Sequence, residues 1–76
     1  MFNEYDLVKA KRDINEKVRK GCSGTIVMVY TSPSLGYEVE FFDHDHQTVD
    51  VLTLEGDDIE IDRIRQEAWL LSKGKR

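Results

Sequence analysis

The chain has 76 residues, a formal net charge of −4, and 39% hydrophobic against 34% charged residues. This length leaves room for one hydrophobic core and therefore for one domain. No apolar run is long enough to span a bilayer, and "MFNEYDLVKAKR" lacks the basic start and apolar stretch of a signal peptide. A single cysteine, Cys22, excludes an internal disulfide and indicates a reducing compartment. We therefore expect a soluble, cytoplasmic domain with no membrane partner.

The first half of the chain predicts two short strands joined by a polar loop. Residues 5–11 form a short β-compatible run, and residues 13–24 ("DINEKVRKGCSG") are polar and charged, as in a loop. Residues 25–30 ("TIVMVY") are β-branched and apolar on both faces, which is typical of a strand covered on both sides. Ser, Pro and Gly in residues 31–36 indicate a turn after this strand.

The second half predicts three further strands. In "YEVEFF" (residues 37–42), apolar and acidic residues alternate, so Glu38 and Glu40 point away from the face of Phe41. Strand-like runs follow at residues 47–54 and 59–61, separated by the turn residues of "EGDD". We expect the core to contain six apolar side chains: Leu7, Ile26, Met28, Val39, Phe41 and Val51.

The last segment, residues 62–76, changes to good helix formers. Ile61, Ile64, Ala68 and Leu71 follow one another at spacings of three, four and three residues, which places them on one helix face. A short helix is marginal alone, so this stripe must dock on something. Packing on the chain's own sheet is the prediction, and a partner or a weak homodimer through the helix is the alternative. The chain thus divides into a β-domain at residues 1–61 and a helix with a basic tail at residues 62–76.

Short strands separated by polar turns favour a small, strongly bent sheet or barrel. The four segments "YDLV", "GCSGTIV", "YEVEF" and "VLTL" together resemble a family of short bacterial proteins that is catalogued as a domain of unknown function. The resemblance covers residues 4–61. It implies a mainly β fold, an SH3-like barrel of about five antiparallel strands with a turn of the KOW type, followed here by the helix. It implies no chemistry.

The "GCSGT" turn has a local explanation. Gly21 and Gly24 can take positive φ without steric cost and so let the chain turn into the strand that begins at Thr25. A strand follows these glycines, not a helix that starts with Lys and Ser or Thr, which excludes a phosphate loop. A nucleophilic Cys22 would need a histidine base, and the sequence places none beside it. We therefore interpret Cys22 as a turn thiol.

The alternating Asp43-His44-Asp45-His46 lies between two strands and predicts a hairpin tip. The resembling family has a pattern closer to Asp-x-Asp-Gly here, so His46 stands at the glycine position and is expected in the left-handed region. A zinc site needs three or four converging ligands, and the sequence offers two histidines without an evident third. We predict no metal and no cofactor.

Catalysis is not expected either. A general acid needs a pocket that shifts its pKa, and a barrel of this size fills its interior with side chains. The chain is therefore interpreted as a binding module. Ten carboxylates and no Lys or Arg occur in residues 37–62, a charge that would complement a basic protein surface. The favoured hypothesis is an inhibitor or immunity protein that neutralises a toxin through an acidic face. Its candidate contact residues are Glu38, Glu40, Asp43, Asp45, Asp50, Asp57 and Asp58.

Two alternatives remain open. A KOW-like module bound to RNA or the ribosome would use basic residues to neutralise phosphate, and the net charge argues against nucleic acid. Its contacts would be Lys9, Lys11, Arg12, Lys17, Arg19 and Lys20. An adaptor subunit of a larger complex would fit the same composition.

Overall fold

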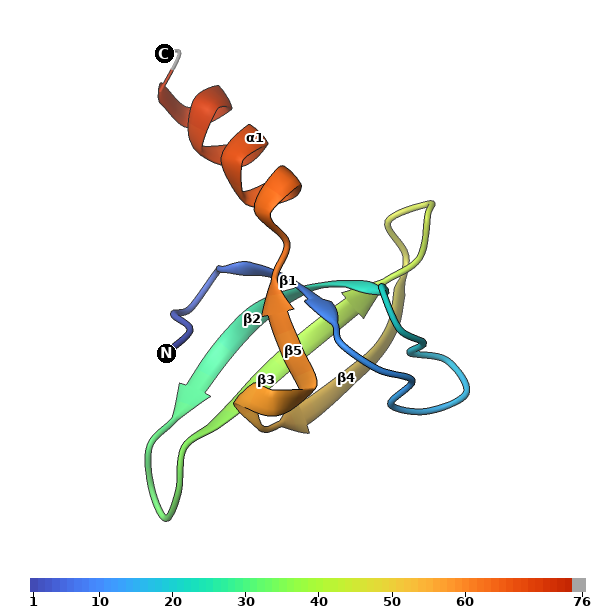
Figure 1. Ribbon diagram of the computed structural model, residues 1–76, viewed down its shortest axis with the longest axis vertical. Helices are drawn as coiled ribbons and strands as arrows, with labels where there is room; N and C mark the ends of the chain where they lie inside the picture. Colours follow the sequence, from blue (N-terminus) through green and yellow to red (C-terminus); the bar gives the residue numbers. More distant parts are fainter. Residues whose placement is uncertain (75–76) are drawn as a thin grey trace.

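Five antiparallel strands and one helix make up the protein (Figure 1). The computed structural model describes residues 1–74, with side chains through Ser72. The elements are β1 (Leu7–Ala10), β2 (Ser23–Tyr30), β3 (Gly36–Phe42), β4 (Thr48–Leu54), a 3-10 turn η1 (Gly56–Asp58), β5 (Ile59–Ile61) and α1 (Arg63–Gly74). This arrangement confirms the predicted mainly β fold with a C-terminal helix.

The strands form one sheet in the order β4-β3-β2-β1-β5. Each neighbouring pair is antiparallel, and the sheet is strongly curved (Figure 1). The buried core consists of Val8, Ala10, Val18, Ile26, Tyr37, Val39, Phe41 and Ile59. Three of the six predicted core residues, Ile26, Val39 and Phe41, are confirmed, and Leu7 is half-buried.

Val18 enters the core from the long loop between β1 and β2, which the sequence marks only as polar. The Asn15 side chain shapes this loop, because its Oδ1 accepts hydrogen bonds from the backbone N–H of Lys17 at 2.8 Å and of Val18 at 2.7 Å. The Val18 side chain is fully buried as a result. The loop, whose Ile14 also packs against the core, therefore closes one side of the core with apolar residues from a mainly polar segment.

Two core predictions are wrong, because Met28 is 44% exposed and Val51 is 48% exposed. In β2, Ile26 opposes Val39 and Met28 opposes Glu38, so Val27 is an extra residue. Such a β-bulge reverses the alternation of the strand beyond it. Met28 therefore shares the outward side of the sheet with Glu38.

The phase of β4 follows from its pairing with β3. Val51 opposes Glu40, whereas Leu52 opposes the buried Val39. Val51 thus points outward, and Leu52 takes the inward side that the sequence analysis predicted for Val51. We call the outward side of β2, β3 and β4 the outer face; it includes Thr25, Met28, Tyr30, Glu38, Glu40, Val51 and Thr53.

The two turn glycines have different roles. Gly21 has a φ of +88°, as predicted, and a side chain there would be strained. Gly24 is not in the left-handed region and lies inside β2, so the expected second positive φ is wrong. A Cβ on Gly24 would lie 2.8 Å from Val39 Cγ1 and 3.0 Å from Phe41 Cδ1. Gly24 therefore allows β2 and the β3 side chains to approach closely.

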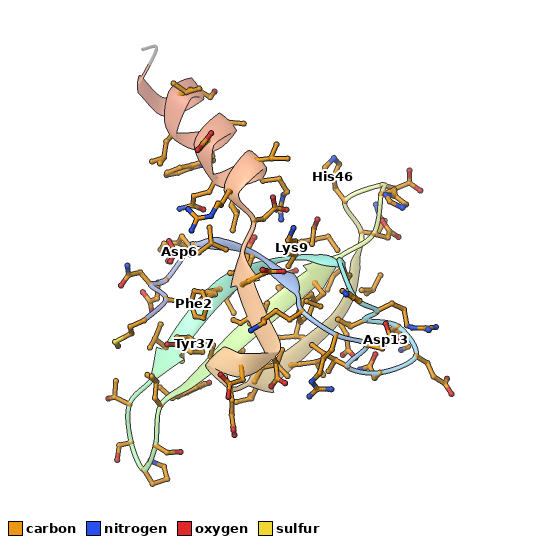
Figure 2. All side chains as sticks on the ribbon, in the orientation of Figure 1. Phe2, Asp6, Lys9, Asp13, Tyr37 and His46 are labelled. Carbon is orange, nitrogen blue, oxygen red and sulfur yellow. The ribbon has the colours of Figure 1, made fainter. Side chains whose placement is uncertain are left out.

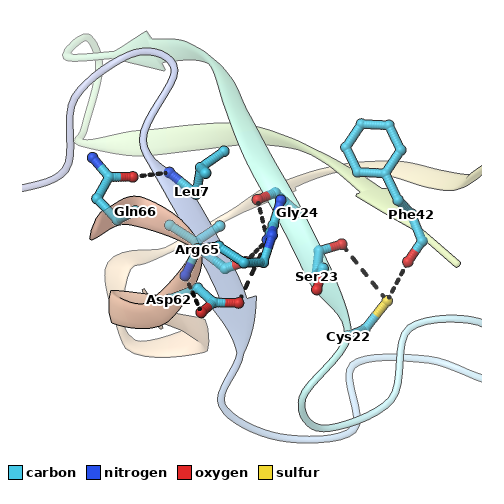
Figure 3. Close-up of polar contacts among 9 residues, drawn as sticks. Leu7, Cys22, Ser23, Gly24, Phe42, Asp62, Arg65 and Gln66 are labelled. Carbon is cyan, nitrogen blue, oxygen red and sulfur yellow. Dashed lines mark hydrogen bonds and ion pairs between the residues drawn. The ribbon is translucent and has the colours of Figure 1, made fainter. Parts of the chain in front are cut away.

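Helix α1 is tied to β1 by its first turn. Asp62 Oδ1 accepts the backbone N–H of Arg65 at 3.2 Å, and Gln66 Oε1 accepts that of Leu7 at 2.8 Å. Arg65 Nη1 donates to the carbonyl of Val8 at 3.3 Å (Figure 3). Beyond this turn the helix projects away from the sheet (Figure 1).

Of the predicted helix stripe, Ile61 belongs to β5 and packs against the core, but the three members in α1 do not pack on the chain's own sheet. Ile64 is 83% exposed, Leu71 is 67% exposed, and Ala68 is also exposed. The preference for packing in cis is therefore wrong, because polar contacts of the first turn direct the rest of the helix into solvent. Docking on a partner stays a prediction. Within residues 1–74, no helix has the length and apolar character needed to cross a membrane.

The stability of the core can be tested with one buried and one exposed position. Phe41→Ala should lower the free energy of unfolding by about 3–5 kcal/mol, because it leaves a cavity in the centre of the core. Val51→Ala, at a position that is 48% exposed, should change it by less than about 0.5 kcal/mol. Urea unfolding followed by circular dichroism measures both. Equal effects of the two substitutions would contradict the strand phases.

Candidate functional site

The outer face places two carboxylates in the middle of the sheet. One cross-strand row contains Thr25, Glu40 and Val51, and the next contains Met28, Glu38 and Thr53. Side chains directly opposite each other in antiparallel strands are close enough to interact. Each glutamate on β3 is thus flanked by an apolar side chain on one neighbouring strand and a hydroxyl on the other.

Both glutamates are held in position by hydroxyl groups. Tyr30 Oη donates to Glu38 Oε1 at 2.8 Å, and Thr48 Oγ1 donates to Glu40 Oε2 at 2.5 Å. The hydrogen bond to Glu38 raises the pKa of Tyr30. An ionised carboxylate has about four acceptor sites, so each keeps capacity for a further donor. Among the described residues neither makes an ion pair, and their negative charge remains available to an external cation.

The hairpin tip continues from the end of the same strand. Asp43 Oδ1 accepts the backbone N–H groups of Asp45 at 2.8 Å and Gln47 at 3.0 Å, so Asp43 holds the turn. Asp45 is exposed. These two acids lie at one end of β3, beyond the outer face.

The other three predicted contact residues lie elsewhere. Asp50 opposes the buried Phe41 and accepts a hydrogen bond from Asn15 Nδ2 at 3.0 Å, so it lies on the side of the sheet opposite to Glu40. Asp57 and Asp58 belong to η1. Asp58 is paired with Arg12 at 2.6 Å, and its side chain is only 16% exposed. The structure therefore brings Glu38 and Glu40 together and separates them from Asp50, Asp57 and Asp58.

His44 and His46 are both exposed in the tip between β3 and β4, and Figure 2 shows His46 pointing away from the sheet. His46 has a φ of +63°, which confirms the predicted left-handed geometry. No group of three or more His, Cys, Asp and Glu side chains that could hold a metal ion occurs in the described part of the chain. That the protein works without a metal stays a prediction.

An open cavity of 340 Å³ lies between the β1–β2 loop and the hairpin tip. Ser23 pairs with Phe42, so Cys22, next to Ser23, and His44, two residues beyond Phe42, line the same cavity. This proximity could not be predicted from the sequence, because it depends on the pairing of β2 with β3. The basic residues of the lining are Lys17, Arg19 and Lys20.

The surroundings of the thiol in this cavity disfavour its thiolate form. Burial raises the pKa of Cys22, and its Sγ donates to the carbonyl oxygen of Phe42 at 3.5 Å (Figure 3). Only a thiolate is a good nucleophile, so a raised pKa makes Cys22 a weak one.

Asp13 orders the basic side of the cavity. It pairs with Arg19 Nη2 at 3.0 Å and accepts the backbone N–H of Lys20 at 2.8 Å. The hydrogen bond from Arg19 is the main cause of the lowered pKa of Asp13, followed by the bond from Lys20. The charge of Arg19 is thus already paired, which leaves Lys17 and Lys20 as the cations of this cavity that make no ion pair among the described residues.

The fold and the outer face define a small antiparallel β-domain with a barrel-like sheet and an appended helix. Residues 4–61 match the family described as a domain of unknown function (DUF4926), and the chain belongs to this family. Searches of curated proteins and of solved structures gave no match. The family match covers the segment expected from the sequence and ends before α1. A bacterial origin and the assignment to SH3-like barrels stay predictions.

The backbone geometry of the tip can be tested by paired glycine substitutions. His46→Gly should leave the free energy of unfolding unchanged or raise it by up to about 1 kcal/mol, because glycine relieves the cost of positive φ. His44→Gly should lower it by up to about 1 kcal/mol, because His44 has no positive φ and glycine only adds freedom to the unfolded chain. Urea midpoints of both variants give the comparison. A larger loss of unfolding free energy for His46→Gly than for His44→Gly would contradict the positive φ of His46.

Proposed function

We propose that this protein is a non-enzymatic binding module whose outer face binds a basic surface of a protein partner. In this proposal it acts in the cytoplasm as an inhibitor or immunity protein, an antitoxin that neutralises a toxin. The main support is the outer face itself, where Glu38 and Glu40 are ordered by hydroxyl donors and make no ion pair within the described residues.

Exposed apolar side chains beside these carboxylates also support the proposal. Met28, Tyr30 and Val51 are 44%, 36% and 48% exposed. Protein interfaces are enriched in Tyr and Met at their centres, where apolar contacts are surrounded by polar groups. Side chains that are already ordered lose less conformational entropy on binding. The outer face therefore combines apolar contact area with two preorganised charges.

The remaining predicted acids have a different role in this proposal. Asp43 and Asp45 extend the negative surface from the end of β3, whereas Asp50, Asp57 and Asp58 contribute mainly to the long-range field. Complementary fields speed the encounter of two proteins more than they tighten the complex. The weak nucleophilicity expected of Cys22 fits a function that does not use catalysis.

A charge reversal tests the proposal. A partner is first captured from native cell extract with the wild-type protein and identified by mass spectrometry. Glu38→Lys with Glu40→Lys should then slow its association by about tenfold or more at low salt, with a smaller effect as salt rises, because screening weakens the wild-type attraction. Surface plasmon resonance measures the rates, and circular dichroism checks the fold.

The matched control is Glu4→Lys with Glu16→Lys, which changes the net charge equally at two exposed positions outside the outer face. This control should retain most of the wild-type association rate. Equal losses in both double variants would assign the effect to net charge alone. Unchanged association in the Glu38 and Glu40 variant would remove the outer face from the function.

The cavity between the loop and the tip keeps one alternative open, a module that binds RNA. Lys17 and Lys20 line it, and such cations can neutralise phosphate. Salt-dependent binding of RNA by the wild type that is lost in Lys17→Ala with Lys20→Ala would favour this alternative. An adaptor role in a larger complex would use the outer face in the same way as the toxin inhibitor.

A further inference from the structure

We propose that the protein self-associates, with helix α1 of one copy docked on the outer face of a second copy. The inference concerns the protein alone and does not rest on the proposed partner. The partner would compete with the helix for the same face. Self-association would therefore keep the outer face covered until a partner arrives.

The helix presents an apolar surface that the chain itself leaves uncovered. Ile64 and Leu71, which lie seven residues apart and therefore on one face of the helix, are 83% and 67% exposed. A helix of 12 residues is marginal in water without tertiary contacts, and α1 is tied to β1 mainly through its first turn. Docking of this surface would bury both side chains and stabilise the outer turns of the helix.

The helix does not cover the outer face of its own copy. Asp62 alone separates β5 from α1. Gln66 Oε1 accepts the Leu7 N–H, and Arg65 donates to the carbonyls of Val8 and Gly24, so the start of the helix is fixed on β1 and β2 (Figure 3). From there the helix leaves the sheet (Figure 1). The helix can therefore contact the outer face of a second copy, although it cannot reach the outer face of its own.

Charge favours contact between helix and sheet over contact between two helices. Residues 63–76 contain five basic residues and one acidic residue, a formal charge of +4. Residues 1–62 contain six basic and fourteen acidic residues, a formal charge of −8. Two such C-terminal segments repel each other, whereas each is attracted to the acidic domain of another copy. The basic C-terminal segment of one copy is therefore complementary in charge to the acidic residues 1–62 of another copy.

The two surfaces also match in length and composition. Twelve helical residues extend about 18 Å, and the seven residues of β3 extend about 24 Å. The outer face offers Met28 and Val51 beside two glutamates, and the helix offers Ile64 and Leu71 beside the exposed Arg63. Apolar groups can thus meet apolar groups while opposite charges pair.

A twofold arrangement would use this contact twice. In a symmetric dimer each helix docks on the other copy's sheet, so the buried area doubles. One short helix on one small sheet buries less than the roughly 1,200–2,000 Å² of a standard stable interface. The reciprocal exchange brings the total closer to that range, and we infer a dimer that dissociates on dilution and with rising salt.

Sedimentation velocity over a series of protein concentrations tests this inference. The wild type should show a monomer–dimer equilibrium that shifts toward monomer as salt rises. Ile64→Asp, at an exposed position that should not disturb the fold, should weaken dimerisation by about tenfold or more, because it places a charge in the apolar contact. Glu38→Lys with Glu40→Lys should weaken it similarly, whereas Glu4→Lys with Glu16→Lys should retain it.

Mixing the two deficient variants distinguishes docking on the sheet from pairing of helices. Ile64→Asp keeps an intact outer face, and the Glu38 and Glu40 variant keeps an intact helix, so one of the two contacts can form between them. Their mixture should therefore associate more strongly than either variant alone. A monomeric wild type, a Glu38 and Glu40 variant that dimerises like the wild type, or a mixture that associates no more strongly than the separate variants would each overturn the inference.

Discussion

The extra residue in β2 is the constraint on which the outer face depends. Ile26 opposes Val39, and Met28 opposes Glu38, so Val27 has no residue of its own opposite it in β3. Without this bulge Met28 would point into the core. With it, Met28 joins the carboxylates of β3 on the solvent side, and Val29 instead faces the side of the buried Tyr37. One inserted residue thus provides an apolar contact beside two ordered negative charges.

The parts of the fold that depend on local pattern could be predicted from the sequence. In β3, the strict alternation of apolar and acidic residues fixes the inward side of Phe41 and the outward side of Glu38 and Glu40. The runs in β2 and β4 contain apolar residues on both faces, so the sequence is compatible with either set of alternating residues facing the core. Only the pairing with β3 determines which set does so. For that reason Met28 and Val51 were wrongly predicted as core.

The candidate site shows the same division between local and non-local information. The outward position of Glu38 and Glu40 follows from β3 alone, but their hydroxyl donors, Tyr30 and Thr48, come from neighbouring strands. The proximity of Cys22 and His44 likewise results from the register of β2 and β3. In α1, the apolar period predicts the helix correctly but not its direction, which depends on contacts between side chains of the first turn and the backbone of β1.

Thiol labelling at two adjacent positions tests the bulge most directly. Met28→Cys and Val29→Cys are made separately in a Cys22→Ser background, so that each protein has a single thiol. The cysteine at position 28 should react with a thiol reagent much faster than the cysteine at position 29, because Met28 is exposed and Val29 packs against the core. Faster labelling at position 29 would place Met28 inside, and the outer face described here would not exist.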